Sequence, residues 1–342
     1  MNEPPRVRVA ILGCGAVTEL AHLPAFARVP GCQATLLVDT NQARRELLSS
    51  RFGVAHSAPD WTMFADEFDG AIVALPHTLH ERACSELLRA GKSVLVEKPM
   101  ATTAAEAGRM IAVADSTGSL LAVGLMRRYQ WAHRLAHELI AGGALGAIHS
   151  FDFREGSPYN WPVASDFFFR RESAGGGVLM DTGAHTIDSL LWWLGPAKTL
   201  DYRDDASGGV EADCMLELQM ASGARGVVEL SRTRSLRNTA IIEAENGRIE
   251  VAMGGNAFSV RMNQSRFTVK GNAAFESATR DQQYLDLIVE QLSDWTEAVR
   301  SRGRPAVGGR DALASIELIE QCYANKRPWL LPWAKTPAEE VA

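Results

Sequence analysis

The sequence predicts a two-domain α/β protein: a doubly wound parallel sheet over residues 1–125, then an α+β domain over residues 126–330 built on an open, mostly antiparallel sheet. The first observation is length, because 342 residues suit about two domains of roughly 100–200 residues each. The second is the alternation of short apolar strands with helices in the first third of the chain. The third is a period-two alternation of apolar and polar side chains over residues 210–269. Residues 331–342 are expected to form a C-terminal tail.

Five short apolar runs in the first third are typical of buried strands in a parallel sheet, because such a sheet is covered by helices on both faces. Helical stretches separate these runs, as in βαβ units. Right-handed crossovers then give a doubly wound sheet with ligands at the carboxyl ends of its strands. The predicted strands are residues 7–12, 34–38, 71–74, 93–96 and 120–124, and the predicted helices are residues 18–28, 80–90 and 104–114.

The pattern changes after residue 125, where a helix over residues 134–140 leads through a glycine-rich turn into a strand over residues 148–154. Within the period-two region, turns are expected at residues 221–223 and at Asn246-Gly247. Because Asn and Gly both tolerate φ > 0, the second pair predicts a two-residue hairpin turn. Helices over residues 284–300 and 310–324 close the chain.

The composition argues against several classes of protein. A formal net charge of −6 gives no basic field for nucleic acid or anionic lipid. No apolar run approaches the roughly 18 residues of a membrane-spanning helix, and the first five residues lack the cationic region of a signal peptide. Five scattered cysteines without a C-x-x-C pair indicate reduced thiols. We therefore expect a cytoplasmic protein that binds neither nucleic acid nor membranes.

A glycine turn follows the first predicted strand and opens the first helix. Gly13 allows a tight turn, and Gly15 has no side chain to keep backbone N–H groups away from a pyrophosphate. Ala16 and Val17 belong to the same predicted cofactor-binding turn. Thr18 stands where the G-x-G-x-x-G pattern has its third glycine, a position that serves helix–strand packing more than phosphate contact. The turn predicts dinucleotide binding.

Asp39 ends the second predicted strand, 21 positions after Thr18. A carboxylate there can accept hydrogen bonds from an adenosine ribose diol and would repel a 2′-phosphate, which favours NAD over NADP. Arg44 and Arg45 follow closely and keep NADP open as an alternative. An ordinary strand–helix turn, with Asp39 as a helix N-cap, would leave the same pattern.

Lys98 lies in the segment Glu97-Lys98-Pro99, directly after a predicted buried strand and therefore where ligands bind. Pro99 restricts Lys98 to an extended conformation, which aims the ammonium. A compact, rotatable cation suits a reacting hydroxyl better than a planar guanidinium does. The other interpretation is a surface salt bridge between Glu97 and Lys98.

Asp181, His185 and Asp188 are spaced i, i+4 and i+7 and share one face of a predicted helix. Histidine is the usual proton acceptor near neutral pH, and a carboxylate one turn earlier can orient its ring or help bind a polyol. The three glycines at residues 175–177 either let the backbone approach a ligand or form a flexible lead into the helix. A buried structural His–Asp pair remains the alternative.

Taken together, these segments resemble the Gfo/Idh/MocA family of NAD(P)-dependent sugar and polyol oxidoreductases. The resemblance runs through most of the chain, and its most specific parts are the Glu-Lys-Pro and G-G-G-x-L-x-D-x-G-x-H segments, in that order after a dinucleotide turn. The matching segments are residues 13–18, 22–25, 75–80, 97–99, 127–129, 142–146 and 175–188.

The resemblance implies an N-terminal Rossmann domain and a catalytic set of Lys98, Asp181 and His185. His185 would take the hydroxyl proton, Lys98 would hold the same oxygen, and the nicotinamide would accept a hydride from the carbinol carbon. Leu75, Pro76, His80 and Glu97 would lie along the ribose and nicotinamide, together with Lys98 itself. The family often has Asn where His77 stands, so the sequence departs from its pattern there.

Substrate contacts are predicted for Tyr129, Trp161 and Arg170, in addition to Asp181 and His185. Aromatic rings offer apolar faces to sugar C–H groups, and arginines suit carboxylates or phosphates. The aromatic residues would equally suit core or interface packing. The sequence therefore predicts a sugar, polyol or sugar derivative as substrate.

No metal is predicted. His133 and His137 are spaced i, i+4 like a metal-binding pair, yet no third ligand accompanies them.

Two other functions fit the same motifs: an NAD-dependent glycosidase with transient redox chemistry, and a cofactor-bound sensor without catalysis. Because the period-two sheet has one face that needs cover, we also expect a homodimer or homotetramer.

Overall fold

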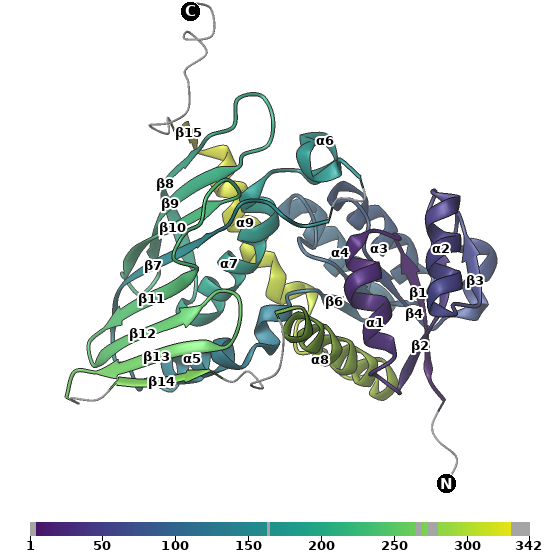
Figure 1. Ribbon diagram of the computed structural model, residues 1–342, viewed down its shortest axis with the longest axis horizontal. Helices are drawn as coiled ribbons and strands as arrows, with labels where there is room; N and C mark the ends of the chain where they lie inside the picture. The colour runs from purple at the N-terminus through teal and green to yellow at the C-terminus, as the bar shows by residue number, and fades with distance from the viewer. Residues whose placement is uncertain (1–4, 163–164, 265–267, 273–279, 330–342) are drawn as a thin grey trace, which may run out of the picture.

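The computed structural model describes residues 5–162, 165–264, 268–272 and 280–329, and it contains two sheets with helices packed between and around them (Figure 1). The predicted tail, residues 331–342, lies outside the described residues. No described helix is both long and apolar enough to cross a membrane.

The first sheet is parallel and has six strands in the order β3-β2-β1-β4-β5-β6, with the order reversing beside β1. All five predicted strands are present, whereas the three-residue β3 was missed because its sequence His-Ser-Ala has no apolar run. The strands are β1 (Val7–Leu12), β2 (Cys32–Val38), β3 (His56–Ala58), β4 (Gly70–Val73), β5 (Ser93–Val96) and β6 (Leu121–Val123).

Helices cover both faces of this sheet, which confirms the doubly wound arrangement. One core packs the strands against α3 (His80–Arg89) and α4 (Ala104–Thr117). The opposite core packs them against α1 (Leu23–Phe26) and α2 (Gln42–Phe52). Short helical turns follow several strands: η2 (Thr62–Glu67), η3 (His77–Leu79) and η4 (Met126–Tyr129).

The predicted helix over residues 18–28 is a π-helix, η1 (Thr18–His22), that runs into the short α1. Pro24 lies in this helix and has no backbone N–H to donate to a regular α-helical ladder. Single-turn π segments accommodate such interruptions.

The last two helices connect the two halves of the chain. α8 (Arg280–Ser301) packs on the first sheet, where Gly70 leaves room for the Trp295 ring: a Cβ at Gly70 would lie 2.9 Å from it. α9 (Gly309–Ala324) places Ile316 in the first core and Ile319 in the second. The division at residue 125 stays a prediction, and the packing of α8 shows that the first core also draws on the end of the chain.

In the described part of the chain, the second sheet has nine strands in the order β14-β13-β12-β11-β7-β10-β9-β8-β15 and is mostly antiparallel, as predicted. Among these strands, only β10–β7 and β15–β8 pair in parallel. Its strands are β7 (Ile148–Gly156), β8 (Ala197–Asp204), β9 (Asp213–Met220), β10 (Arg225–Ser231), β11 (Thr239–Ala244), β12 (Gly247–Ala252), β13 (Ala257–Met262), β14 (Thr268–Asn272) and β15 (Lys326–Pro328).

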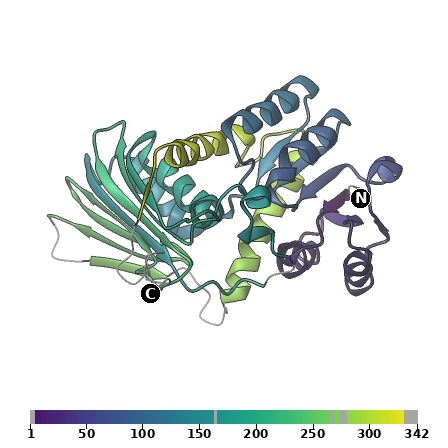
Figure 2. The same ribbon diagram turned by 90° about the horizontal axis from the view of Figure 1, so that it is seen from above.

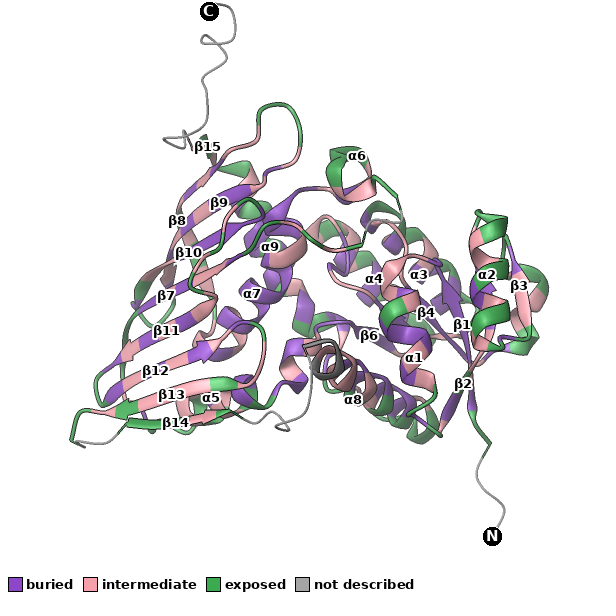
Figure 3. Ribbon diagram, in the orientation of Figure 1, coloured by how far each residue is buried: buried purple, intermediate pink, exposed green. Residues whose placement is uncertain are grey.

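The described helices lie on one face of the second sheet, and none of them covers the other, which is called the bare face below (Figure 2). The covering helices are α5 (Trp131–Ala141), α7 (Val178–Leu194) and α9, which share a core with the strands. Burial alternates along β9, β11 and β12, as the period-two pattern predicts (Figure 3). The short helices η5 (Phe167–Phe169) and α6 (Arg171–Ala174) lead into α7.

The β11–β12 hairpin is confirmed, but its turn lies one residue earlier than predicted. Ala244 pairs with Gly247, so Glu245 and Asn246 form the turn, and neither has positive φ. Their N–H groups donate to the carbonyls of Ala147 and Leu145 in the preceding glycine-rich loop. Gly247 is needed for space instead, because a Cβ there would lie 2.3 Å from the Arg261 carbonyl oxygen of β13.

Candidate active site

The glycine turn has the conformation that a phosphate-binding turn needs. Gly13 has φ +101°, and a Cβ there would lie 2.2 Å from the carbonyl oxygen of Ala74. A Cβ at Gly15 would meet no heavy atom of the described residues within 4 Å, so its backbone is open to a ligand. The Thr18 hydroxyl donates to the Gly13 carbonyl at 2.7 Å. Thr18 therefore closes the turn from the position of the missing third glycine. Ala16 and Val17 lie between Gly15 and Thr18 and are half-buried.

Asp39 lies beside this turn. One carboxylate oxygen accepts the Cys14 N–H at 2.7 Å, and the other accepts the Asn41 N–H at 2.8 Å. Arg44 donates to the Cys14 carbonyl at 2.7 Å and pairs with Glu19, so a carboxylate partly offsets its positive charge. The open backbone of the turn and the adjacent carboxylate fit the pyrophosphate and ribose of NAD.

Lys98 and Asp181 meet across the two halves of the chain, 83 residues apart in sequence. The Lys98 ammonium donates to Asp181 Oδ1 at 2.5 Å and to the Asp181 carbonyl at 3.3 Å. Lys98 follows β5, and Asp181 lies in the first turn of α7. The alternative of a Glu97–Lys98 side-chain salt bridge is not what the structure shows, because Glu97 binds the His22 ring at 2.8 Å.

Arg232, which the sequence reasoning missed, binds the other oxygen of Asp181. Its guanidinium donates to Asp181 Oδ2 at 2.7 Å, and it follows β10 on the second sheet. Burial alone would raise the pKa of the Asp181 carboxyl, yet the neighbouring Lys98 and Arg232 cations hold that pKa well below its usual range. Asp181 is therefore a permanent carboxylate at neutral pH.

His185 lies one turn after Asp181 and is 8% exposed. Burial lowers its pKa well below the usual value, and the charges of Lys98 and Arg127 lower it further. The ring is therefore neutral at pH 7 and able to accept a proton. Its Nδ1 is buried and has no hydrogen-bond partner among the described residues. Asp181 does not orient this ring as the sequence suggested, since cations occupy both of its oxygens.

Glu211 satisfies the N-terminus of α7 and gives Gly177, the last of the three glycines, a structural role. Glu211 Oε1 accepts the N–H groups of Gly177 and Leu179 at 2.9 and 3.0 Å, and its carbonyl accepts the Val178 N–H. A Cβ at Gly177 would lie 1.9 Å from that carbonyl oxygen. Gly177 thus allows the Glu211 segment, which precedes β9, to approach the start of α7.

Leu75 and Pro76 are half-buried at the carboxyl end of β4, and two histidines hold the loop that contains them. His80 is fully buried, with its ring nitrogens 2.9 Å from the carbonyl oxygens of Leu75 and Pro99. His77 contacts the Ala174 carbonyl at 2.8 Å, and burial lowers its pKa to about 3. Both rings are engaged by the protein backbone, so they position the loop.

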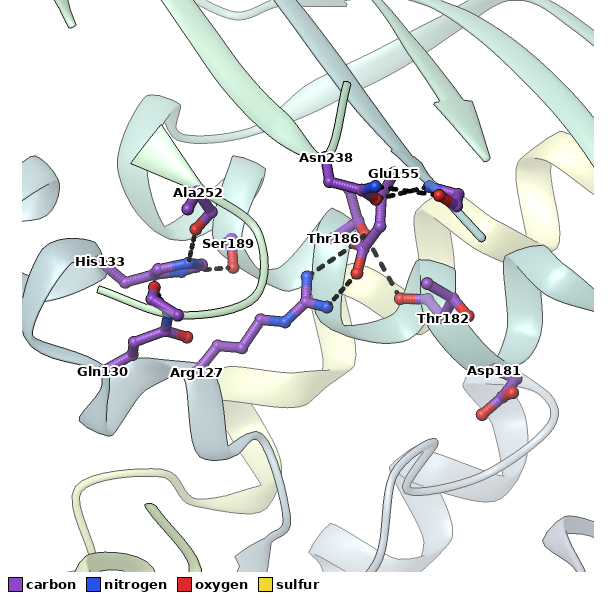
Figure 4. A network of polar contacts seen from close by, with 12 residues as sticks. Arg127, Gln130, His133, Glu155, Asp181, Thr182, Thr186, Ser189, Asn238 and Ala252 are labelled. Atoms are coloured by element: carbon purple, nitrogen blue, oxygen red, sulfur yellow. Dashed lines mark hydrogen bonds and ion pairs between the residues drawn. The ribbon is translucent and has the colours of Figure 1, made fainter. Parts of the chain in front are cut away.

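A second buried ion pair flanks α7 (Figure 4). The Arg127 guanidinium makes a bidentate contact with the Glu155 carboxylate, at 2.9 and 2.5 Å. The Thr186 hydroxyl donates to the same carboxylate at 2.6 Å. Two residues after Thr186, Asp188 pairs with Arg128 at 2.7 Å. These pairs join η4 to β7 and to α7, the helix that carries His185.

The three residues predicted only for substrate contact have different surroundings. The Tyr129 ring is buried and its hydroxyl donates to Asp294 at 2.8 Å, so it packs against α8. Arg170 is exposed and paired with Asp166 on the surface. This geometry does not support a contact of Tyr129 or Arg170 with a substrate bound at the Lys98–Asp181 pair.

Trp161 packs beside Tyr284, which lies near Glu97 and Asp181. Its ring contacts that of Tyr284 at 5.9 Å, and the pKa of Tyr284 is raised by burial and by the charges of Glu97 and Asp181. Tyr284 lies in a predicted helix, but no spacing in the sequence marks it as a site residue.

The candidate metal pair on α5 is used for packing. The His133 ring contacts the Ala252 carbonyl and the Ser189 hydroxyl, and the His137 ring contacts the Trp192 carbonyl.

Two parts of the chain match known protein families. Residues 7–125 match the "Oxidoreductase family, NAD-binding Rossmann fold", and residues 133–250 match the GFO/IDH/MocA C-terminal domain. The chain belongs to the Gfo/Idh/MocA family. The predicted family, the predicted fold class and NAD as the predicted cofactor are thereby confirmed.

Curated relatives of this Gfo/Idh/MocA chain include a dTDP-3,4-didehydro-2,6-dideoxy-alpha-D-glucose 3-reductase of Actinomadura kijaniata. It is 31% identical over 192 residues, which are 55% of this chain and 56% of that protein. The rhizopine catabolism protein MocA of Rhizobium meliloti is 24% identical over 92% of this chain and 93% of its own length. The chain spans about half the length of several curated relatives that it matches.

The fold of this Gfo/Idh/MocA chain is also that of solved structures. An oxidoreductase from Agrobacterium radiobacter, in complex with NAD+, L-tartaric acid and magnesium, has a TM-score of 0.83 and 21% identity. The likeness covers 94% of this chain and 96% of that one.

Proposed function

We propose that this chain is an NAD(P)-dependent dehydrogenase or reductase that acts on a secondary alcohol or ketone of a sugar, polyol or sugar derivative. The observation that most directly supports this proposal is the contact between Lys98 and Asp181. It joins the carboxyl end of the dinucleotide-binding sheet to the helix that holds His185. The relative named as a dTDP-sugar 3-reductase supports a sugar derivative as the substrate class.

In the proposed reaction, His185 accepts the hydroxyl proton during oxidation and returns it during reduction. Lys98 donates a hydrogen bond to the same oxygen and stabilises the negative charge that develops there. When bound, the nicotinamide supplies the hydride chemistry. Asp181 holds the Lys98 ammonium in place through its carboxylate. The aromatic pair of Trp161 and Tyr284 offers an apolar surface for sugar C–H groups.

The test is a panel of D-glucose, myo-inositol and UDP-glucose with NAD and with NADP, followed by absorbance. Lys98→Ala is expected to lower kcat on the substrate found by about 10²-fold, since one preorganised donor to the reacting oxygen is removed. Unchanged turnover by this variant would contradict the assignment. Release of sugar from a glycoside without net NADH would identify the glycosidase instead.

We also propose that Asp39 makes the enzyme prefer NAD. Asp39→Ser removes the charge that repels a 2′-phosphate, while Arg45 stays nearby with its guanidinium on the Asp39 carbonyl at 3.0 Å. The ratio of kcat/KM for NADP to that for NAD is expected to rise at least about tenfold, or about 1.4 kcal/mol. A ratio equal to that of the unsubstituted protein would show that Asp39 only shapes the turn.

We further propose a cytoplasmic homodimer or homotetramer that buries the bare face of the second sheet. This face is less apolar than expected: Val227 and Ile241 lie among ion pairs such as Arg154 with Glu229 at 2.9 Å. A second copy would cover the half-buried side chains and the backbone between them. Light scattering at micromolar concentration should give the mass of two or four chains, and a single-chain mass would contradict the proposal.

A further inference from the structure

Arg232 lies on the far side of Asp181 from Lys98 and is held there by several contacts. It is 9% exposed, its N–H donates to the Ala212 carbonyl at 2.8 Å, and its guanidinium lies 5.3 Å from the Tyr159 ring centre. The guanidinium reaches Asp181 Oδ2 at 2.7 Å and the Gly177 carbonyl at 3.4 Å. Arginine and carboxylate thus meet in a fixed, desolvated geometry.

The two oxygens of Asp181 are divided between two cations. Lys98 takes Oδ1 and Arg232 takes Oδ2. An ammonium has three donors, and Lys98 directs two of them at Asp181; the third has no acceptor among the described residues. Without Arg232, the whole negative charge of Asp181 would attract the Lys98 ammonium toward the carboxylate. Because Arg232 binds the other oxygen and shares that charge, the Lys98 ammonium keeps its orientation and one N–H donor for a substrate.

We propose that Arg232 is a positioning residue for the reaction, which holds the Asp181 carboxylate so that the Lys98 ammonium keeps a donor directed at the substrate oxygen. The proposal rests on the proposed function above, because it gives Lys98 an oxygen to hold. It assigns Arg232 no contact with the substrate.

The groups around Asp181 indicate that Arg232 is the residue that holds this carboxylate. Among the described residues, the other titratable groups near Asp181 are Lys98 after β5, His77 from η3, Tyr159 after β7, Tyr284 from α8 and His185 on its own helix. Burial lowers the pKa of both histidines, so both are uncharged at pH 7. Arg232 is therefore the second full cation on this carboxylate.

The test compares Arg232→Gln with the matched control Arg154→Gln, whose guanidinium pairs with Asp152 and Glu229 on the bare sheet face. Turnover is measured with NAD and D-glucose, myo-inositol or UDP-glucose, whichever the panel shows to be a substrate. Arg232→Gln should lower kcat by about 10- to 100-fold with KM little changed, since one hydrogen bond to a buried charge is lost. Arg154→Gln should keep kcat within about twofold.

Two readouts separate positioning from a purely structural role. Arg232→Lys, which keeps the charge, should recover most of the lost kcat, and it remains usable if the glutamine variant does not fold. In an Asp181→Asn background, Arg232→Gln should cost less than about threefold, because its target charge is gone. An equal loss in both backgrounds, or no loss in Arg232→Gln, would overturn the proposal.

The two proposals fail in distinguishable ways. If Lys98→Ala leaves turnover unchanged, the proposed function fails whatever Arg232 does. If Lys98→Ala is impaired while Arg232→Gln resembles Arg154→Gln, only the role of Arg232 is lost.

Discussion

Replacing His185 by asparagine is expected to lower kcat for alcohol oxidation by about 10²–10⁴-fold, the usual contribution of a positioned general base. Asparagine keeps a polar side chain of similar size but cannot accept the hydroxyl proton. The variant should bind NADH as the unsubstituted protein does, which fluorescence titration measures, because the glycine turn and Asp39 are untouched.

His137→Asn is the matched control for this experiment. His137 lies on the neighbouring helix α5, where its ring stacks on Trp192 at 4.4 Å and contacts the Trp192 carbonyl. Its loss should affect stability slightly and kcat little. Equal kcat values in the His137 and His185 variants would contradict the assignment of His185 as the proton acceptor.

The pH dependence follows from the same environment. Burial, helped by Lys98 and Arg127, lowers the pKa of His185, so the neutral, proton-accepting form persists below the ordinary histidine pKa of about 6.5. Oxidation should therefore lose kcat/KM only below about pH 6.5. A loss centred well above that pH would contradict a depressed pKa at His185.

The sequence predicts what depends on short-range pattern. β1 and β5 have the predicted bounds because each is a short, mainly apolar run, which Gly13 ends after β1 and Glu97 ends after β5. Lys98 and His185 were found because a proline, a strand end and an i, i+4 spacing mark them locally. Their convergence depended on tertiary packing, since Lys98 follows a strand of the first sheet and His185 lies on α7, which packs on the second sheet.

Arg232 and Glu211 escaped prediction because their partners are distant in sequence. Arg232 begins an arginine-rich segment between two strands, where one arginine looks like the next, and it meets Asp181 from 51 positions away. Tyr129 shows the opposite difficulty: its segment resembles one that faces a substrate, but a short turn does not fix which side its ring takes. In the structure the ring packs against α8, from 165 positions away.

Gly177→Ala is expected to lower the free energy of unfolding by about 3 kcal/mol, the upper part of the usual range for overpacking. The added Cβ would lie 1.9 Å from the Glu211 carbonyl oxygen and 2.7 Å from its nitrogen. Both neighbours are backbone atoms, so the strain cannot be relieved by turning a side chain. The Glu211 segment would have to move away from α7 and lose its bonds to the Gly177, Val178 and Leu179 N–H groups.

Gly108→Ala is the matched comparison, because Gly108 lies inside α4 and a Cβ there would meet no described heavy atom within 4 Å beyond its chain neighbours and the nearby backbone of its own helix. An interior helical glycine replaced by alanine should stabilise the protein by about 0.5–1 kcal/mol. Thermal melting should therefore move in opposite directions for the same chemical change. The shift at Gly177 should be accompanied by a fall in kcat, since the segment that moves positions Asp181 and His185. Melting temperatures that agree for the two variants would mean that Glu211 does not hold the start of α7.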